Sequence, residues 1–304
     1  MAKYVVKRVL LAILTIFIVS AITFFSMYAI PGGPFSSEKA LSPAVMAALE
    51  ARYGLDQPVP VQYVNYMSRL LFQADFGVSL KTGRDVFETI TTGMQVSAKL
   101  GLSAAAVAIV FGLVLGSVAA LNRGKFIDRI IVFFTTLATS APSFVLATLL
   151  LLVFSIQLGW VPVWSATEQN YVLPVISLCL YPMAYITRLT KTSMLDALNQ
   201  DYIRTARAKG VASYKVIFKH ALRNALIPVV TYVGPMVAFI ITGSMVVESI
   251  FSTGGLGSYF VSSITNRDYT LIMGVTIFLA ILMVTANLIT DIVYKLIDPR
   301  ITFD

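Results

Sequence analysis

The chain has 304 residues, of which 57% are hydrophobic and only 12% are charged, and its mean hydropathy is +0.81. This composition excludes an ordinary soluble globular protein and indicates an integral membrane protein that crosses the bilayer several times. The formal net charge of +8 lies in short loops between apolar runs, so it reflects membrane topology and does not indicate nucleic-acid binding. Cys179 is the only cysteine, which excludes an intrachain disulfide.

Six apolar runs are long enough to cross about 30 Å of hydrocarbon as helices. They cover residues 9–30, 95–121, 130–156, 171–190, 228–250 and 271–293. A β-barrel would need short alternating segments, whereas these runs are continuous. The sequence therefore predicts an all-α integral membrane protein with six transmembrane helices.

The distribution of basic residues predicts how these helices are oriented. With six crossings, both termini lie on one side, and sixteen of the 23 Lys and Arg residues fall on that side. Because Lys and Arg are enriched in cytoplasmic loops, both termini and the loop at residues 191–227 are predicted to be cytoplasmic. Residues 1–94 then comprise the first transmembrane helix and an extracytoplasmic segment, and residues 95–304 form a five-helix core.

The extracytoplasmic segment is predicted to contain two short helices. Ser42-Pro43 begins the first, which covers Ala44–Tyr53 and stops at Gly54. The second covers Val61–Phe72. The simplest interpretation is a small external cap that packs on the membrane helices.

The second span has small residues at every fourth position. On a helix they form one smooth stripe, which lets another helix approach closely and gain van der Waals contact. The members of the stripe are Ala104, Ala108, Gly112, Gly116 and Ala120. Bends are expected in later spans at Pro142, Pro182 and Pro235.

The loop that precedes the fifth span is patterned as structure. A first helix is predicted from Asp201 to Lys209, with Asn199 or Asp201 as its cap and Gly210 as its stop. A second helix is predicted from Ser213 towards Ala225, lying at the membrane surface with its basic residues in one stripe. The loop could be a positively charged topology anchor or a docking element for a partner. A short, terminated helix favours docking, because an anchor needs only charge.

The residues of this loop resemble a known family. The run RTARAKG, from Arg204 to Gly210, resembles the cytoplasmic loop of ABC-importer permease subunits of the peptide and nickel branch. In the wider family this loop begins Glu-Ala-Ala, followed by three residues and Gly. Here Arg204 and Thr205 depart from that pattern, whereas Ala206 and Gly210 match it. The segment Glu248–Tyr269 and the tail Asp298-Pro299-Arg300 are similar to the same branch, and the outer segment resembles its oligopeptide-transporting members.

The resemblance implies the fold of a type I ABC importer permease in a bacterial cell membrane, and uptake of oligopeptides by alternating access. The implied partners are a second permease chain, two cytoplasmic ATPase subunits, an extracytoplasmic peptide-binding protein and membrane lipid. The implied ATPase-docking residues are Asp201, Tyr202, Arg204, Thr205, Ala206, Arg207, Ala208, Lys209 and Gly210. Of these, we expect Tyr202, Thr205 and Ala206 to supply contact and Gly210 the turn.

The implied outer gate comprises Glu248, Gly255, Gly257, Arg267 and Asp268. An acidic group near the end of a span must be paired or hydrated. Two interpretations of Glu248 are therefore a pair with Arg267 and a hydrated carboxylate at the membrane interface.

Catalytic, cofactor and metal sites are not predicted. The chain lacks a Gly-x-x-x-x-Gly-Lys-Ser/Thr phosphate loop, and its single histidine, His220, cannot form a His-Glu-x-x-His zinc site. ATP hydrolysis is therefore expected on separate subunits. The alternative function is an ion-coupled secondary transporter of small solutes, which would need ionisable groups deep in the membrane. Glu248 and Asp291 lie near span ends, which disfavours that alternative.

Overall fold

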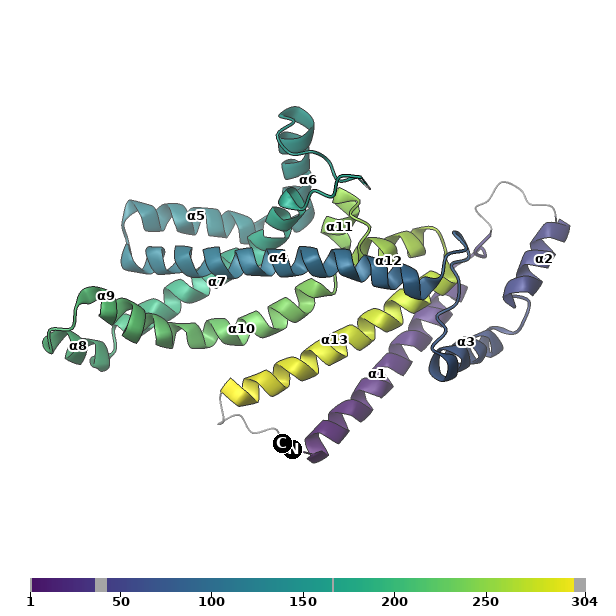
Figure 1. Cartoon of the computed structure of the whole chain (residues 1–304), viewed down its shortest axis with the longest axis horizontal. Helices are drawn as coiled ribbons and strands as arrows, with labels where there is room; N and C mark the ends of the chain where they lie inside the picture. Colours follow the sequence, from purple (N-terminus) through teal and green to yellow (C-terminus); the bar gives the residue numbers. More distant parts are fainter. Residues whose placement is uncertain (1, 36–42, 166, 298–304) are drawn as a thin grey trace.

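A computed structural model describes residues 2–35, 43–165 and 167–297, with side chains at 6–35, 44–165 and 167–290. The described residues are almost entirely helical; Val78 and Asp85 form an isolated β-bridge. Five helical segments are long and apolar enough to span a membrane (Figure 1). They are α1 (Ala2–Ala29), α4 (Val86–Leu121), α7 (Val172–Leu198), the helix from Ser213 to Ile241, and α13 (Tyr269–Ile297). The predicted all-α membrane fold is confirmed.

The third predicted span, at residues 130–156, is not one straight helix. It is divided into α5 (Phe126–Ser140) and α6 (Ser143–Leu150), which continues through the π-helical segment η1 (Leu151–Gln157). The two parts are bent by 107°, and α6 rises away from α5 in Figure 1. The break has a local cause, since Pro142 disfavours helical geometry at the preceding residue and Ala141 is extended there. The chain thus has six spans only if this bent pair is one crossing.

The small-residue stripe of α4 packs against α7. Ala104 and Ala108 are completely buried, and Gly112 and Gly116 are buried beside them. A Cβ atom added at Gly112 would lie 2.7 Å from Ile186 Cβ, and one at Gly116 would lie 2.6 Å from the carbonyl oxygen of Thr187. The predicted close packing is confirmed, and its partner is a helix of the same chain.

The two short helices predicted between the first and second spans are both present. Helix α2 (Pro43–Tyr53) stops at Gly54, whose φ is +67°, and α3 (Val59–Gln73) follows. These helices pack on the adjacent spans α1 and α13 through a buried aromatic and methionine cluster. The cluster includes Phe24, Met27, Tyr66, Met67, Tyr269 and Met273.

The fifth span begins earlier and ends earlier than predicted. Helix α9 (Ser213–Lys215), the π-helical segment η2 (Val216–Leu222) and α10 (Arg223–Ile241) run on without a break. A separate surface helix from Ser213 was therefore a wrong prediction, because the same helix enters the span. The helix stops at Ile241, where Gly243 adopts φ +95°, and two short helices follow, α11 (Met245–Phe251) and α12 (Leu256–Thr265).

Three sequence expectations fall outside the described residues. They concern Ser42, which was predicted to begin α2, the tail Asp298-Pro299-Arg300, and the side chain of Asp291.

Replacing Gly112 by Leu should destabilise the bundle by about 1–3 kcal/mol, because its side chain would overlap Ile186 unless α4 and α7 separate. The measurement is the yield and thermal midpoint of detergent-extracted protein. Val110→Leu is the control, because Val110 is exposed on the same helix. An unchanged midpoint for Gly112→Leu would show that the close approach of the two helices is not needed.

Candidate functional site

Helix α8 (Asp201–Ala208) lies at one end of the molecule, opposite the end that carries α2 and α3 (Figure 1). Its predicted extent is confirmed to within one residue, with Lys209 at the C-cap. Gly210 follows with φ +75°, a left-handed conformation that side chains with a Cβ rarely adopt. The cap prediction was wrong: Gln200 occupies the N-cap and makes no side-chain capping bond.

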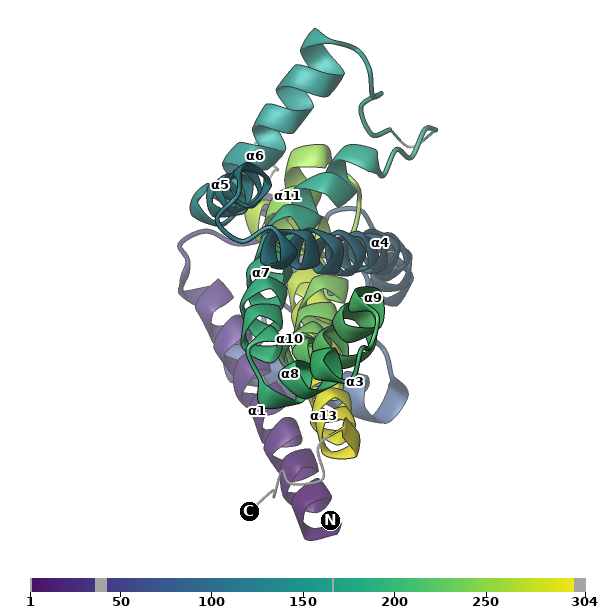
Figure 2. The same ribbon diagram turned by 90° about the vertical axis from the view of Figure 1, so that its left-hand side faces the viewer.

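One face of α8 is anchored to the start of the fifth span. Ile203 and Ala206 are buried against Val216 and Ala221 of η2 and against Ala197 at the end of α7. Ala206 was expected to contact a partner, but it is only 8% exposed because it belongs to this internal cluster. The helix is therefore fastened to both α7 and the start of the fifth span, and Figure 2 shows it below α7 and α10 in that view.

The opposite face of α8 is free to contact another molecule. Its exposed residues are Asp201, Tyr202, Arg204, Thr205, Arg207 and Ala208. Tyr202 is 40% exposed, and its hydroxyl accepts a hydrogen bond of 3.0 Å from Asn224 Nδ2. Arg204 and Asp201 form an ion pair of 3.3 Å, but both side chains are largely exposed, so this pair adds little stability.

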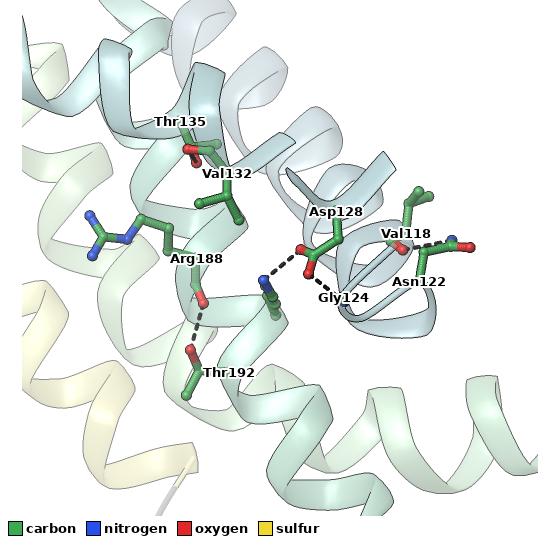
Figure 3. Close-up of polar contacts among 9 residues, drawn as sticks. Val118, Asn122, Gly124, Asp128, Val132, Thr135, Arg188 and Thr192 are labelled. Carbon is green, nitrogen blue, oxygen red and sulfur yellow. Dashed lines mark hydrogen bonds and ion pairs between the residues drawn. The ribbon is translucent and has the colours of Figure 1, made fainter. Parts of the chain in front are cut away.

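An ion pair that the sequence did not reveal joins α5 to α7. The Lys191 ammonium donates to Asp128 Oδ1, and the backbone N–H of Gly124 donates to Oδ2 at 3.0 Å. Figure 3 shows Asp128 above the turn that contains Gly124, facing α7. Asp128 is only 6% exposed. Asp128 and Lys191 are 63 positions apart in the sequence, and residues so far apart form no local pattern that would reveal the pair.

Glu248 is completely buried, with 0% exposure, and both carboxylate oxygens accept hydrogen bonds. Ser97 Oγ of α4 donates to Oε1 at 2.7 Å, and Ser244 N donates to the same oxygen at 3.2 Å. Gly257 N and Ser258 N donate to Oε2 at 2.8 Å and 3.2 Å. A hydrated interfacial carboxylate is therefore excluded, and Arg267 is not among the partners of Glu248.

These contacts place the carboxyl group of Glu248 at the start of α12. The first backbone N–H groups of α12 lack partners within the helix, and they carry partial positive charge. Glu248 satisfies two of them, and Ser97 Oγ accepts from a third, Leu256 N, at 2.8 Å. Sequence reasoning selected Glu248 but missed Ser97, since the two are 151 residues apart.

The predicted gate glycines surround this carboxylate. A Cβ at Gly255 would lie 2.4 Å from Glu248 Oε2, and one at Gly257 would lie 3.0 Å from the same atom. Both positions therefore need glycine if the carboxylate is to reach α12. The structure brings Glu248, Gly255 and Gly257 together as one unit.

Arg267 and Asp268 lie at the other end of α12 and belong to a different contact. The buried Asp268 carboxylate accepts hydrogen bonds from Ser79 Oγ, from Leu80 N at 3.1 Å and from Leu271 N at 3.2 Å. It thus ties the segment before α4 to the start of α13. Arg267 makes the turn between α12 and α13 with φ +55°.

Most of the chain matches a family of transport proteins in sequence. Residues 112–303 match the family described as "binding-protein-dependent transport system inner membrane component", and residues 1–101 match its N-terminal part. The dipeptide transport system permease protein DppB of Bacillus subtilis is 45% identical over 99% of this chain and 98% of its own length. The oligopeptide permease OppB of Haemophilus influenzae is 44% identical, and that of Escherichia coli 40%, each over the full length of both chains.

Solved transporter structures share the fold. An inward-facing MetNI methionine ABC transporter chain superposes with a TM-score of 0.57 and 17% identity, covering 69% of this chain and 97% of its own. An amino acid ABC transporter chain gives a TM-score of 0.56 at 15% identity, over 69% of this chain and 94% of its own. At this level of identity the likeness concerns the fold alone.

Replacing Glu248 by Gln should lower stability by about 1–3 kcal/mol, because one carboxylate oxygen becomes an amide that cannot accept from two of the buried donors. The measurement is the thermal midpoint in detergent. Glu88→Gln, on the exposed start of α4, serves as the control and should leave the midpoint unchanged. Equal midpoints for the two variants would contradict a structural role for the Glu248 contacts.

Removing one partner of the Asp128–Lys191 pair should cost more than removing both charges. Lys191→Met leaves a buried carboxylate unpaired, and we expect a loss of about 3 kcal/mol, the low end for buried pairs because Lys191 is 22% exposed. The double variant Asp128→Asn with Lys191→Met should recover part of this loss. Thermal unfolding of the single and double variants is the measurement, and a strictly additive loss would disprove the coupling.

Proposed function

Because the chain belongs to the family of binding-protein-dependent transport system inner membrane components, we propose that it is one permease subunit of an ATP-driven importer of peptides. The peptide cargo is supported by the relatives, which are named as dipeptide and oligopeptide permeases and match over nearly their whole length. The low charge content of the chain also suits peptides of varied sequence, because a pathway with few charged groups binds its cargo weakly.

The proposed assembly contains a second permease chain, two cytoplasmic ATPase subunits and an extracytoplasmic peptide-binding protein. ATP hydrolysis occurs on the ATPase subunits, since this chain has no phosphate loop. The second permease chain and lipid together cover the apolar side chains exposed on the spans. Examples of these side chains are Leu10 and Ile22 on α1, Phe133 and Phe134 on α5, and Phe239 on α10.

The observation that carries the proposal is the two-sided character of α8. Its inner face is fixed to α7 and to the fifth span, and its outer face presents Tyr202, Thr205 and neighbouring charges. A partner that moves α8 must therefore move both spans with it. Lys209 and the excess of basic residues at this end support a cytoplasmic location for α8, with both termini on the same side.

Motion of α8 has a continuous route to the opposite end of the molecule. Helix α7 ends directly before α8, and it is in close contact with α4 at Gly112 and Gly116. Further along α4, Ser97 holds Glu248 and the start of α12. We propose that α4 and α7 tilt as one body, so that closure of the ATPases opens the outer end at α11 and α12.

The alternative, an ion-coupled secondary transporter, differs in its energy source. Uptake of a labelled tripeptide should persist when ion gradients are collapsed while ATP is maintained. Depleting ATP while the gradients are kept should abolish uptake. The opposite pattern would favour the secondary transporter and disprove the proposal.

Gly210→Val should uncouple ATP hydrolysis from peptide uptake, because a β-branched residue cannot hold φ +75° and α8 would lose its fixed orientation. We expect at least a tenfold loss of uptake with normal membrane insertion, measured in vesicles together with ATPase activity. Gly159→Val is the matched control, since Gly159 has φ +61° and open space but lies far from α8. Normal uptake by the Gly210 variant would contradict the role of α8.

A further inference from the structure

A cavity of about 480 Å³ opens between the external cap and the membrane helices. Its walls come from α1, the α2–α3 pair and the start of α13, at the end of the molecule opposite α8 (Figure 1). The residues that matter for its chemistry are Tyr28, Arg52, Gln62, Tyr66, Arg69 and Tyr269. A cavity of this volume is within the range that small ligands occupy.

The cavity contains a buried hydroxyl that has no partner. Tyr66 lines the cavity and is only 7% exposed, and its hydroxyl oxygen makes no hydrogen bond to any described residue. Buried polar groups are nearly always paired in folded proteins. The Tyr66 hydroxyl thus lacks a partner among the described residues beside the cavity, and because the oxygen is itself buried, a ligand reaches it once neighbouring side chains move aside.

The charge of the cavity favours an anionic ligand. Arg52 and Arg69 line it, both are exposed, and neither forms an ion pair within the described part of the chain. None of the described lining residues is Asp or Glu. A guanidinium group binds a carboxylate through two parallel hydrogen bonds, which makes arginine well suited to this anion.

The remaining walls suit the rest of a peptide. The amide of Gln62 is held in place, since its Nε2 donates to Leu55 O at 3.1 Å and to Gln57 O at 2.7 Å, while its Oε1 accepts from Tyr28. Asn65, Gln57 and Ser68 add donors and acceptors, and the rings of Tyr53 and Tyr269 add apolar surface. A peptide has the same mixture of amide groups, side chains and one terminal carboxylate.

We propose that this cavity binds the terminal carboxylate of a short peptide, with Arg52 and Arg69 as its charge partners and Tyr66 as a hydroxyl donor. The choice of a peptide rests on the proposed function, whereas the site itself rests on the cavity. A peptide delivered at the outer end of the molecule would be held here before it enters the pathway.

The experiment uses the complete importer, purified in detergent without its binding protein. Radiolabelled tri-alanine is the probe, and equilibrium dialysis measures its affinity. We expect tri-alanine to bind and its C-terminal amide to bind about tenfold more weakly, the loss of one charge-assisted contact. The double variant Arg52→Gln with Arg69→Gln should bind tri-alanine only as tightly as the wild type binds the amide. Tyr66→Phe should lower the affinity for tri-alanine several-fold.

Arg84→Gln is the matched control, because Arg84 is an exposed arginine of the same outer segment that does not line the cavity. This variant should bind tri-alanine as the wild type does. Equal binding of tri-alanine and its amide, or unchanged binding by the double arginine variant, would overturn the inference. Weakened docking of the binding protein in the arginine variants, with no binding of tri-alanine, would also overturn it and assign the cavity to an acidic side chain of that protein.

Peptide uptake is measured separately, so that the two proposals can fail independently. If the wild type takes up tri-alanine with ATP and the cavity variants bind it normally, the proposed binding site is disproved and the proposed function is supported. If the wild-type importer takes up no peptide, the proposed function is disproved instead.

Discussion

The close contact between α4 and α7 determines how the rest of the structure is arranged. Helices in lipid gain little from burying apolar side chains, so their association depends on contact at short range. Gly112 and Gly116 allow that contact, because any Cβ there would overlap Ile186 or Thr187. Helix α7 continues into the α8 region and α4 extends to Ser97 beneath α12, so this one interface connects the two ends of the molecule.

Buried polar groups secure the ends of these two helices. Asp128 and Lys191 hold α5 to α7, and Glu248 with Ser97 holds α12 to α4. Leaving any of these groups without a partner would be costly in a membrane, where water cannot replace a lost hydrogen bond. Each contact joins helices far apart in sequence, so the contacts make α4, α5, α7 and α12 behave as a connected frame. Such a frame suits a protein that must transmit a movement from one side to the other.

Sequence patterns predicted the local features well and the distant contacts poorly. The stripe from Ala104 to Ala120 and the short helix ended by Gly210 follow from composition and spacing, and the structure contains both. Four of the six apolar runs form spans close to the predicted bounds, whereas the third is bent and the fifth ends at Ile241. The 107° bend at Pro142 was expected only as a bend, because proline determines where a helix breaks and packing determines the angle. The burial of Glu248 was not predictable, since its donors come from Ser97 and from a helix start that only the fold brings near.

The central claim is that the exposed face of α8 receives an ATP-hydrolysing partner. The most direct test places a photo-crosslinking amino acid at Thr205 in native membranes and identifies the adduct by mass spectrometry. The account predicts an adduct with a chain that carries a Gly-x-x-x-x-Gly-Lys-Ser/Thr loop. It predicts no adduct with that chain from Val64, an exposed residue of α3, which is the helix at the opposite end of the molecule (Figure 1). Adducts from Thr205 with lipid alone, or the same protein adduct from both positions, would contradict the account.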